Sequence, residues 1–453
     1  MQLKGHIWLL SFGVASFILS FLTGSAVFGY DSEAQPWREL NLVTTSGKRN
    51  STDVNVLFAT TRLNEGNSNQ PRLGNQRHLD LGNGSLIFGV CNLQRPSTIT
   101  NSLDAGHLMS YQSIFTSNYT AWQSTPTTAI NLFTESDFYN QVSNFQGTVC
   151  VFIHGFDKPF ESAIRDGAQL SDEFYRRTGG HSGPFLPIVF SWPSQGSKAQ
   201  YSADEATVEW SREAFITFMN RLILAMNPQA TLNVVAHSMG NRLVVTSPER
   251  LLMTDGNPRI TNILLCSPDV DMQTFEYQKS KVENLAAGMV YVFVCDRDGA
   301  LITSQTLHLQ PRLGRPIDLP QNESPALANV SSNLPAEGFI NKFLSGVMNI
   351  NSAIRGEDHV NDTLDVQQWL AGNPALEREL GPKTRFIDVT DLNTGDVGHR
   401  LAIPVVAGLM LKEPDFSPFH ISVVHKRPDC LTLLEMGRTP LWLYRYYKLT
   451  LPN

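Results

Sequence analysis

Residues 232–245 read Leu-Asn-Val-Val-Ala-His-Ser-Met-Gly-Asn-Arg-Leu-Val-Val, and this stretch decides the fold. The apolar start predicts a strand and the end predicts a helix, so Ser238 stands on a sharp turn between the two. Ala236 and Gly240, two positions on either side of the serine, are small enough to let the strand and helix backbones approach each other. The pattern is that of a nucleophile elbow, with alanine in place of the usual first glycine.

From about residue 148 onward, apolar strands and helical stretches alternate. This order predicts an α/β fold, a mostly parallel, doubly wound sheet with helices on both faces. Expected strands and helices between 149 and 389 are, in order, Val149–Ile153, a helix at 159–177, Ile188–Phe190, a helix at 204–226, Leu232–Val235, a helix from Asn241, Ile263–Cys266, a helix at 273–285, Val290–Val294 and Arg385–Val389.

Regions outside this core have other compositions. Strand patterns at Val54–Phe58 and Ser85–Val90 predict an N-terminal, β-rich extension over residues 54–147. Within it, the Ser/Thr/Asn-rich segment 92–130 is expected to be mostly irregular, and a short helix is expected from Asp137. The α/β domain would then span 148–450, with an insertion at about 319–383 that we expect to form a lid.

The N-terminus predicts export. Lys4 precedes an apolar stretch from Ile7 to Phe28, and the first acidic residues follow it. Residues 1–29 are therefore expected to be a signal peptide, ending near Gly24-Ser25-Ala26, or a membrane anchor, since the stretch is long enough to remain in a bilayer. A polar linker covers 30–53. These features predict a secreted, periplasmic or envelope-anchored protein, with membrane association through this segment in the anchored case.

Composition excludes several functions. The chain has 453 residues, 42% of them hydrophobic, and a net charge of −7 without long runs of Lys or Arg, which argues against a nucleic-acid partner. We find no phosphate-binding glycine loop and no metal-ligand spacing, so no cofactor and no metal are expected. The five cysteines are too scattered for a disulfide framework and are expected to be buried thiols: Cys91, Cys150, Cys266, Cys295 and Cys430.

A serine nucleophile needs a base within hydrogen-bond distance and a carboxylate that orients this base. On this fold the chain order is serine, acid, histidine. Asp298 follows the second strand after Ser238 and is the expected acid, while Asp296, Asp269 and Asp271 compete with it or cap helices. Three histidines follow the last strand and spacing does not decide among them: His399, His420 and His425.

A second motif, His154-Gly155-Phe156-Asp157, ends the strand at 149–153. We expect the backbone N–H groups of Phe156 and Met239 to form an oxyanion hole. The alternative is a tight turn with a buried imidazole. Trp192 follows another strand and is expected to line the substrate site, with core packing as the alternative.

Taken together, several stretches resemble a family of α/β-hydrolases, largely uncharacterised bacterial proteins whose core follows a Phe-Ala-Thr-x-Arg strand. The resemblance covers roughly residues 54 to 318. It is carried by seven stretches: Phe58-Ala59-Thr60-Thr61-Arg62, Phe152-Ile153-His154-Gly155-Phe156, Phe190-Ser191-Trp192-Pro193-Ser194, residues 236–241, Pro268-Asp269-Val270-Asp271, Asp298-Gly299-Ala300-Leu301 and Arg312-Leu313-Gly314.

By this resemblance Asp298 takes the acid role. The resemblance also favours His420 as the base, because the family's histidine tends to precede a hydroxyl or aromatic residue, then a proline and a helix. Asp157, where asparagine is usual, departs from the pattern. We therefore expect a serine hydrolase with a triad of Ser238, Asp298 and His420, acting on a small-molecule carboxylic ester through an acyl-enzyme. Amidase, thioesterase and peptidase activities would use the same residues, and a non-catalytic binding module is the alternative from another class.

Overall fold

A computed structural model describes eight ranges of the chain: residues 53–78, 86–99, 108–177, 184–254, 256–295, 298–315, 383–389 and 399–411. The expected signal segment, the linker up to residue 52, the insertion up to residue 382 and Cys430 lie outside them. No helix among the described residues is both long and apolar enough to cross a bilayer.

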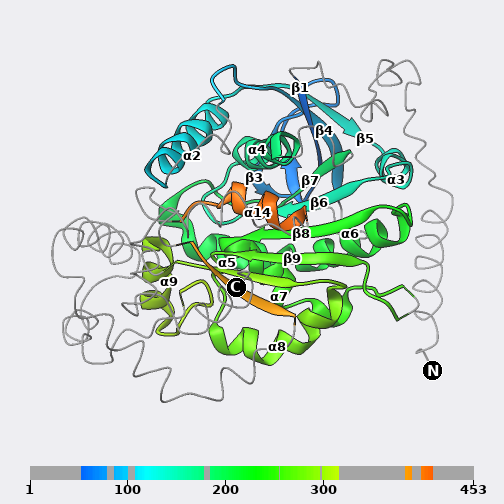
Figure 1. The fold of residues 1–453 in the computed structure, drawn as a ribbon. Helices are drawn as coiled ribbons and strands as arrows, with labels where there is room; N and C mark the ends of the chain where they lie inside the picture. The colour runs from blue at the N-terminus through cyan, green and yellow to red at the C-terminus, as the bar shows by residue number, and fades with distance from the viewer. Residues whose placement is uncertain are drawn as a thin grey trace, which may run out of the picture. The chain divides into compact units, whose positions relative to one another are not determined.

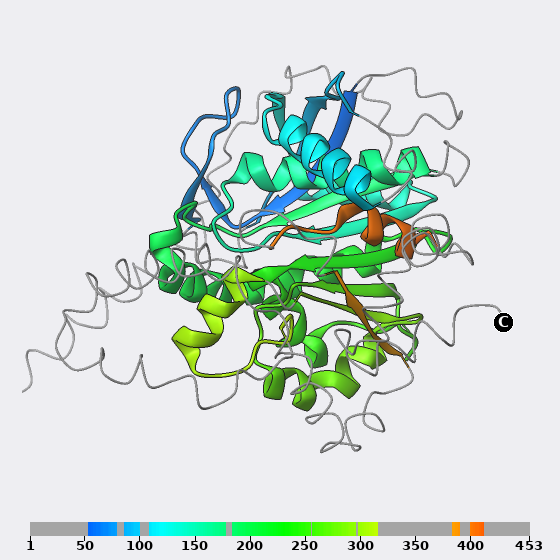
Figure 2. The same cartoon turned by 60° about the vertical axis from the view of Figure 1, so that its left-hand side comes forward.

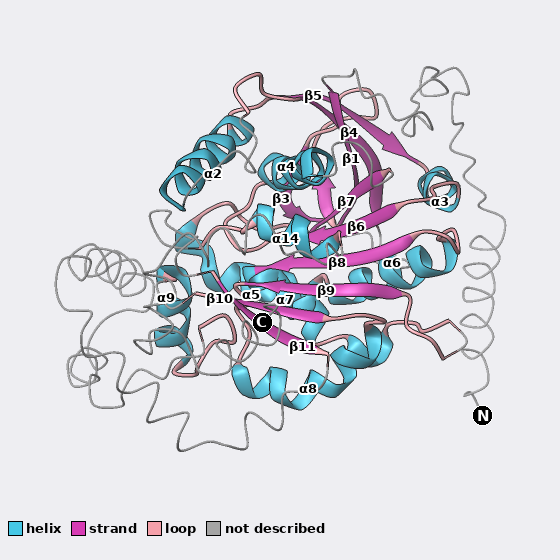
Figure 3. Ribbon diagram, viewed as in Figure 1, coloured by secondary structure: helices cyan, strands magenta, loops and turns pink. Residues whose placement is uncertain are grey.

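The core of the described region is a nine-stranded sheet with the order β11-β10-β9-β8-β6-β7-β1-β4-β5 (Figure 3). The strands from the β11 edge to β7 are parallel, as the alternating pattern predicts. The parallel strands are β6 (Thr148–Ile153), β7 (Phe185–Ser191), β8 (Thr231–His237), β9 (Ile260–Cys266), β10 (Val290–Val294) and β11 (Thr384–Asp388). These strands confirm the predicted α/β fold.

The N-terminal extension continues this sheet. β1 (Asp53–Thr60) lies parallel to β7, and β4 (Ile87–Gln94) and β5 (Thr127–Phe133) follow in antiparallel register. A separate two-stranded sheet joins β2 (Arg62–Asn64) to β3 (Leu73–Arg77). Because β1 pairs with β7 over Leu57 to Thr60, its end reaches the same edge of the sheet as the end of β7.

The segment 92–130 is more regular than its composition suggested. It contains α2 (Leu108–Gln123) and the start of β5, so the expectation of an irregular segment is wrong. Phe115, Asn118 and Trp122 recur every three or four residues and are buried, and α2 packs on α4. Tertiary burial of this stripe outweighs the weak helix propensity of its Ser, Thr and Asn residues.

Helices cover both faces of the sheet. α4 (Phe160–Arg177) crosses β7 and β1, and α2 and α14 (Ile403–Met410) pack against it (Figures 1 and 2). The chain then turns back across β6 to β8. With right-handed crossovers, this reversal places the later helices on the opposite face: α5 (Tyr201–Trp210), α6 (Arg212–Ala225), α7 (Asn241–Val245) and α8 (Met272–Leu285). The expected single helix at 204–226 is two helices, divided at Ser211.

Two shorter helices complete the description. α3 (Glu135–Ser143) begins at the N-cap Thr134, whose hydroxyl accepts a hydrogen bond from the Asp137 N–H, and it packs on α6. α9 (Gly299–His308) follows β10 directly. The four described cysteines are buried, as predicted: Cys91, Cys150, Cys266 and Cys295.

The direction of winding changes between β6 and β8, which are neighbours in the sheet. Helices that follow these two strands cover opposite faces, so a crevice opens beyond the strands' carboxyl ends. His154 follows β6 and Ser238 follows β8 at this point. The topology thus brings the two sequence motifs together at the place where open α/β sheets bind ligands.

Candidate active site

Ser238 has the backbone geometry of a nucleophile elbow. Its φ is +53°, in the left-handed region that a non-glycine residue rarely adopts. A short 3-10 helix, Ser238–Gly240, leads from β8 directly into α7. The strained residue therefore stands at the turn between strand and helix, as the sequence predicted.

Close backbone contacts explain the small residues of this motif. A Cβ atom on Gly240 would lie 2.4 Å from the carbonyl oxygen of His154, and one on Gly155 would lie 2.6 Å from the Ser238 Cβ. Ala236 is fully buried. The elbow and the loop after β6 thus touch through glycines, and no larger side chain fits at either position without a shift of the backbone.

A continuous hydrogen-bonded chain runs through the site. His399 Nε2 lies 2.7 Å from Ser238 Oγ, and His399 Nδ1 lies 2.5 Å from Asp298 Oδ2. All three side chains are largely or fully buried. Serine, imidazole and carboxylate have the arrangement of a catalytic triad, in the predicted order along the chain for serine and acid.

Asp298 uses both carboxylate oxygens. Oδ2 contacts His399, while Oδ1 accepts a hydrogen bond of 2.9 Å from the Leu301 N–H and so caps α9. The helix cap fixes the rotation of the carboxylate, because both oxygens have partners in different directions. Asp298 therefore caps α9 and contacts His399 at the same time.

The charge of Asp298 controls the protonation of His399. Burial would lower the pKa of the imidazole, but the charge of Asp298 and its hydrogen bond to His399 outweigh this effect. The pKa of His399 is raised above its usual 6.5. An imidazolium that formed during a reaction would be stabilised at this position.

The choice of His420 for the base is corrected by this geometry. His399, on the loop before α14, fills the position beside Ser238 that His420 was expected to fill. His420 and His425 lie outside the described residues. His399 stood among the three candidates, and its sequence signal was its position in the first loop after the last strand.

The competing aspartates have other partners. Asp269 N–H donates to the Ser238 carbonyl oxygen, and Asp271 precedes α8 and pairs with Arg312. Asp296 lies outside the described residues. Asp298 is thus the aspartate that the described structure brings to a histidine.

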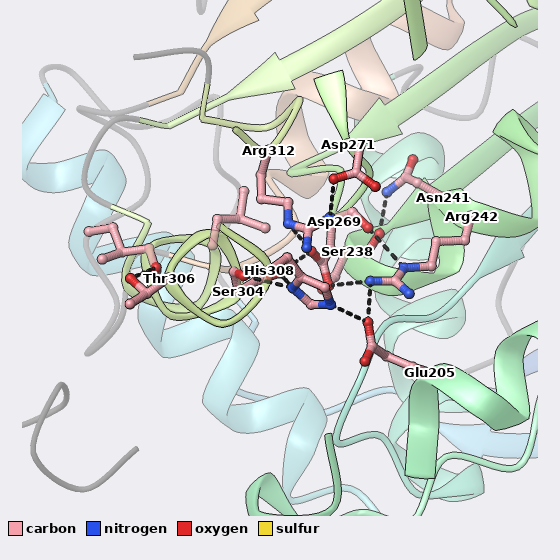
Figure 4. Close-up of polar contacts among 12 residues, drawn as sticks. Glu205, Ser238, Asn241, Arg242, Asp269, Asp271, Ser304, Thr306, His308 and Arg312 are labelled. Carbon is pink, nitrogen blue, oxygen red and sulfur yellow. Dashed lines mark hydrogen bonds and ion pairs between the residues drawn. The ribbon is translucent and has the colours of Figure 1, made fainter. Parts of the chain in front are cut away.

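A buried polar network supports the elbow from the side of α9 (Figure 4). Its centre is the Asp269 carboxylate, which accepts hydrogen bonds from two hydroxyls and pairs with two guanidinium groups: Tyr201 (2.5 Å), Ser304 (2.5 Å), Arg242 (3.6 Å) and Arg312 (3.4 Å). Burial would raise the pKa of Asp269, but the two arginine charges prevail and lower it. Its carboxylate is ionised and fully used inside the network.

The network also links α9 to α5. His308, at the end of α9, contacts Glu205 at 2.6 Å, and Arg242 pairs with the same carboxylate at 2.7 Å. A hydrogen bond from His308 to Glu205 helps raise the pKa of the imidazole. Since α9 begins at the Asp298 cap and ends at His308, both ends of this helix are fixed.

The loop at residues 154–158, here called the oxyanion loop, lies against the elbow. Within the described part of the chain, the N–H of Phe156 makes no hydrogen bond. The N–H of Met239 is among the first of a 3-10 helix and so has no partner within that helix. Both N–H groups are available for an acceptor, as an oxyanion hole requires.

Trp192 supports this loop and does not line a substrate site. It is fully buried, its indole N–H donates to the His154 carbonyl oxygen at 2.8 Å, and its ring stacks on the His154 ring at 4.9 Å. The expected substrate contact is therefore corrected to packing beneath the oxyanion loop. The His154 imidazole is fully buried, as the alternative interpretation of a tight turn predicted, and the next residue, Gly155, lies against Ser238.

Sheet topology, elbow and triad geometry define the class: this chain has the α/β-hydrolase fold. Residues 132–341 match the sequence model of a family described as alpha/beta hydrolase of unknown function (DUF900). No curated protein shows significant sequence similarity to the chain. The match includes Ser238 and Asp298 but leaves β1 to β4 and His399 outside it.

Proposed function

We propose that the protein is a serine hydrolase that cleaves carboxylic esters through a covalent acyl-enzyme. Ser238 is the nucleophile, His399 the general base and Asp298 the residue that orients the imidazole. The observation that carries the proposal is the chain of two short hydrogen bonds from Asp298 through His399 to a serine at φ +53°. The N–H groups of Phe156 and Met239 stabilise the oxyanion.

The contacts suggest the following reaction. Ser238 Oγ attacks the ester carbonyl carbon while His399 Nε2 takes its proton, and the imidazolium remains hydrogen bonded to Asp298. Collapse of the tetrahedral intermediate expels the alcohol, which receives the proton from His399. Water, deprotonated by the same nitrogen, then attacks the acyl carbon, and the acid leaves as the Ser238 Oγ bond breaks and Oγ takes the proton back from His399.

A fluorophosphonate probe tests the nucleophile. We expect the full-length chain to be labelled on the tryptic peptide that contains Ser238, as identified by mass spectrometry, and the Ser238→Ala variant to remain unlabelled. Ser247 is also buried and lies just after α7, the helix that follows Ser238, so Ser247→Ala is a matched control that should label normally. Absence of label on Ser238 in the folded protein would refute the proposed function.

The substrate class needs a second measurement. Matched esters, thioesters and anilides of the same acyl groups, compared by kcat/KM, separate esterase from thioesterase and amidase activity. We expect the oxygen esters to be cleaved fastest. A preference for anilides would move the proposal to an amidase with the same three residues.

The distance between His399 and Ser238 argues against a non-catalytic binding module. Such a module could keep the elbow as architecture without a base, whereas a nitrogen of His399 lies 2.7 Å from the Ser238 hydroxyl. The further proposals rest on sequence alone: export to the envelope or the medium, by residues 1–29, and a small-molecule ester substrate.

A further inference from the structure

Arg62 is a fully buried cation near the candidate site. It ends the Phe58-Ala59-Thr60-Thr61-Arg62 stretch. Among the described residues, no carboxylate lies within ion-pair distance of its guanidinium group. Its nitrogens instead contact six neutral groups: Ser191 Oγ (2.8 Å), the Gly74 carbonyl (3.1 Å), Asn75 Oδ1 (2.9 Å), the Ser194 carbonyl (3.3 Å), the Lys158 carbonyl (2.7 Å) and His154 Nε2 (3.5 Å).

Such a charge is unfavourable for stability alone. Burial of a cation without an anionic partner costs several kcal/mol, which hydrogen bonds to neutral acceptors only partly offset. This burial lowers the pKa of Arg62 to about 9, against the opposing charges of Glu161 and Asp204. A well-packed apolar side chain would serve a purely structural position better, so the residue has a role that its hydrogen bonds define.

These hydrogen bonds join three segments at the carboxyl edge of the sheet. They reach the oxyanion loop, the end of β7 with the turn after it, and the start of β3. The threonines beside Arg62 fix its backbone. Thr60 Oγ1 donates to the Ser191 carbonyl at 2.6 Å, and Thr61 Oγ1 lies 3.1 Å from Ser211 Oγ.

In the oxyanion loop, the contact to Arg62 completes a set of backbone restraints. Lys158 N–H donates to Ser194 Oγ at 3.0 Å, and Asp157 N–H donates to Asp204 at 3.4 Å. Arg62 binds the Lys158 carbonyl from the other side. The peptide groups that follow Phe156 therefore have fixed orientations, and Asp157 is held at a φ of +57°.

Arg62 also selects one state of His154. The Nδ1 atom lies 2.8 Å from the Gly155 carbonyl, which can only accept, so Nδ1 carries the proton. Nε2 then faces the Arg62 guanidinium as an acceptor. Burial, followed by the charge of Arg62, lowers the pKa of His154 far below its usual value, and the ring stays neutral.

We propose that Arg62 is a positioning residue of the active site, which holds the oxyanion loop so that the Phe156 N–H faces the developing oxyanion. The residue comes from the N-terminal extension, outside the segment 132–341 that matches the family. This inference rests on the proposed function, because it needs an oxyanion to be stabilised. If Arg62 has this role, the N-terminal extension contributes a residue that positions the active site.

Two variants test the proposal. Arg62→Lys keeps the charge but cannot reach six acceptors, and Ser194→Ala removes the acceptor of the Lys158 N–H without touching Arg62. Arg177→Lys is the matched control, since Arg177 is a buried arginine that pairs with Glu173 at the end of α4. Exhaustive fluorophosphonate titration gives the concentration of reactive serine, and kcat is expressed per titrated site.

We expect kcat per site to fall about 10- to 100-fold in Arg62→Lys and about 5-fold in Ser194→Ala, with KM within about 3-fold. Affinity for a trifluoromethyl ketone, which forms an oxyanion on the enzyme, should fall in proportion to kcat/KM. A merely structural role would reduce the titrated fraction and leave kcat per site unchanged.

The outcomes separate the two proposals. Wild-type kcat per site and wild-type ketone affinity in both variants would overturn the role of Arg62 while the serine hydrolase stands. If Arg62→Lys does not fold, Ser194→Ala still tests whether the backbone restraints at Lys158 matter, and wild-type kcat per site in this variant would overturn the proposal. Failure of the wild-type protein to react with the probe would refute the proposed function itself.

Discussion

Replacing Gly155 by alanine tests how tightly the elbow and the oxyanion loop are packed. The new Cβ would lie 2.6 Å from the Ser238 Cβ, 3.1 Å from the His237 carbonyl oxygen and 3.2 Å from His237 Nδ1. Ordinary van der Waals contact begins at 3.4 Å, so the loop and the elbow must separate by about 0.8 Å. Both backbones are held in place by hydrogen bonds to other segments, which resist this separation.

Displacements of this size are costly at a reacting centre. A misplacement of about 1 Å lowers rates by roughly 10²-fold, and loss of one oxyanion donor lowers kcat by about 10²- to 10³-fold. We expect Gly155→Ala to lower kcat by about 10²-fold. KM should change by less than about 3-fold, because the lost interaction forms mainly in the transition state.

The assay is ester hydrolysis per titrated serine, with thermal unfolding measured on the same samples. Gly408→Ala is a suitable control, since a Cβ there would meet the end of the flexible Arg177 side chain at 3.2 Å. This control should keep its rate. Folded Gly155→Ala protein with kcat within about 3-fold of wild type would refute the close contact between loop and nucleophile.

Three further predictions concern the triad and its support. His399→Ala should lower kcat by at least about 10⁴-fold, whereas kcat of His420→Ala should stay within about 3-fold of wild type, both measured with the same ester. The reverse result would restore His420 as the base. The raised pKa of His399 predicts that kcat/KM falls as pH decreases through a midpoint above 6.5, because the base must be neutral. In Asp298→Asn the loss of the carboxylate should move that midpoint below 6.5 and lower kcat by about 10⁴-fold; an unmoved midpoint would assign the titration to another group. Trp192→Phe leaves the His154 carbonyl without its hydrogen-bond donor. The free energy of unfolding, measured by denaturant titration, should therefore fall by about 1 to 3 kcal/mol, while KM should change little. A large rise in KM would restore the prediction that Trp192 contacts the substrate.

The hydrophobic pattern predicted the parallel core because the strands β6 to β10 are buried on both faces. β6 is apolar from Val149 to Ile153 and β8 from Val234 to Ala236, and such runs leave few alternatives when turns and helices separate them. α2 escaped prediction for the opposite reason. Its sequence favours turns, and it becomes a helix through the burial of Phe115 and Trp122 in the folded protein.

In the candidate site, too, some residues could be predicted from their neighbours in the sequence, and others only from the fold. Ser238 carries a local signature, since the turn needs small neighbours and a strand before it, and Asp298 follows a strand at the expected place. A histidine has no such signature, because its role depends on which loop reaches the serine. Sequence similarity favoured His420, and spacing left three residues open.

Arg62 extends this point to the oxyanion loop. The Phe-Ala-Thr-x-Arg resemblance marked the stretch but assigned it no chemistry, because its partners lie up to 132 residues away in the chain. In the fold, the pairing of β1 with β7 brings the arginine to the same sheet edge as Ser238. A strand outside the matched family segment thereby supplies the guanidinium that restrains the loop beside the nucleophile. For this reason we expect a truncated chain that begins at residue 132 to lose the ordered oxyanion loop even if Ser238, His399 and Asp298 remain together.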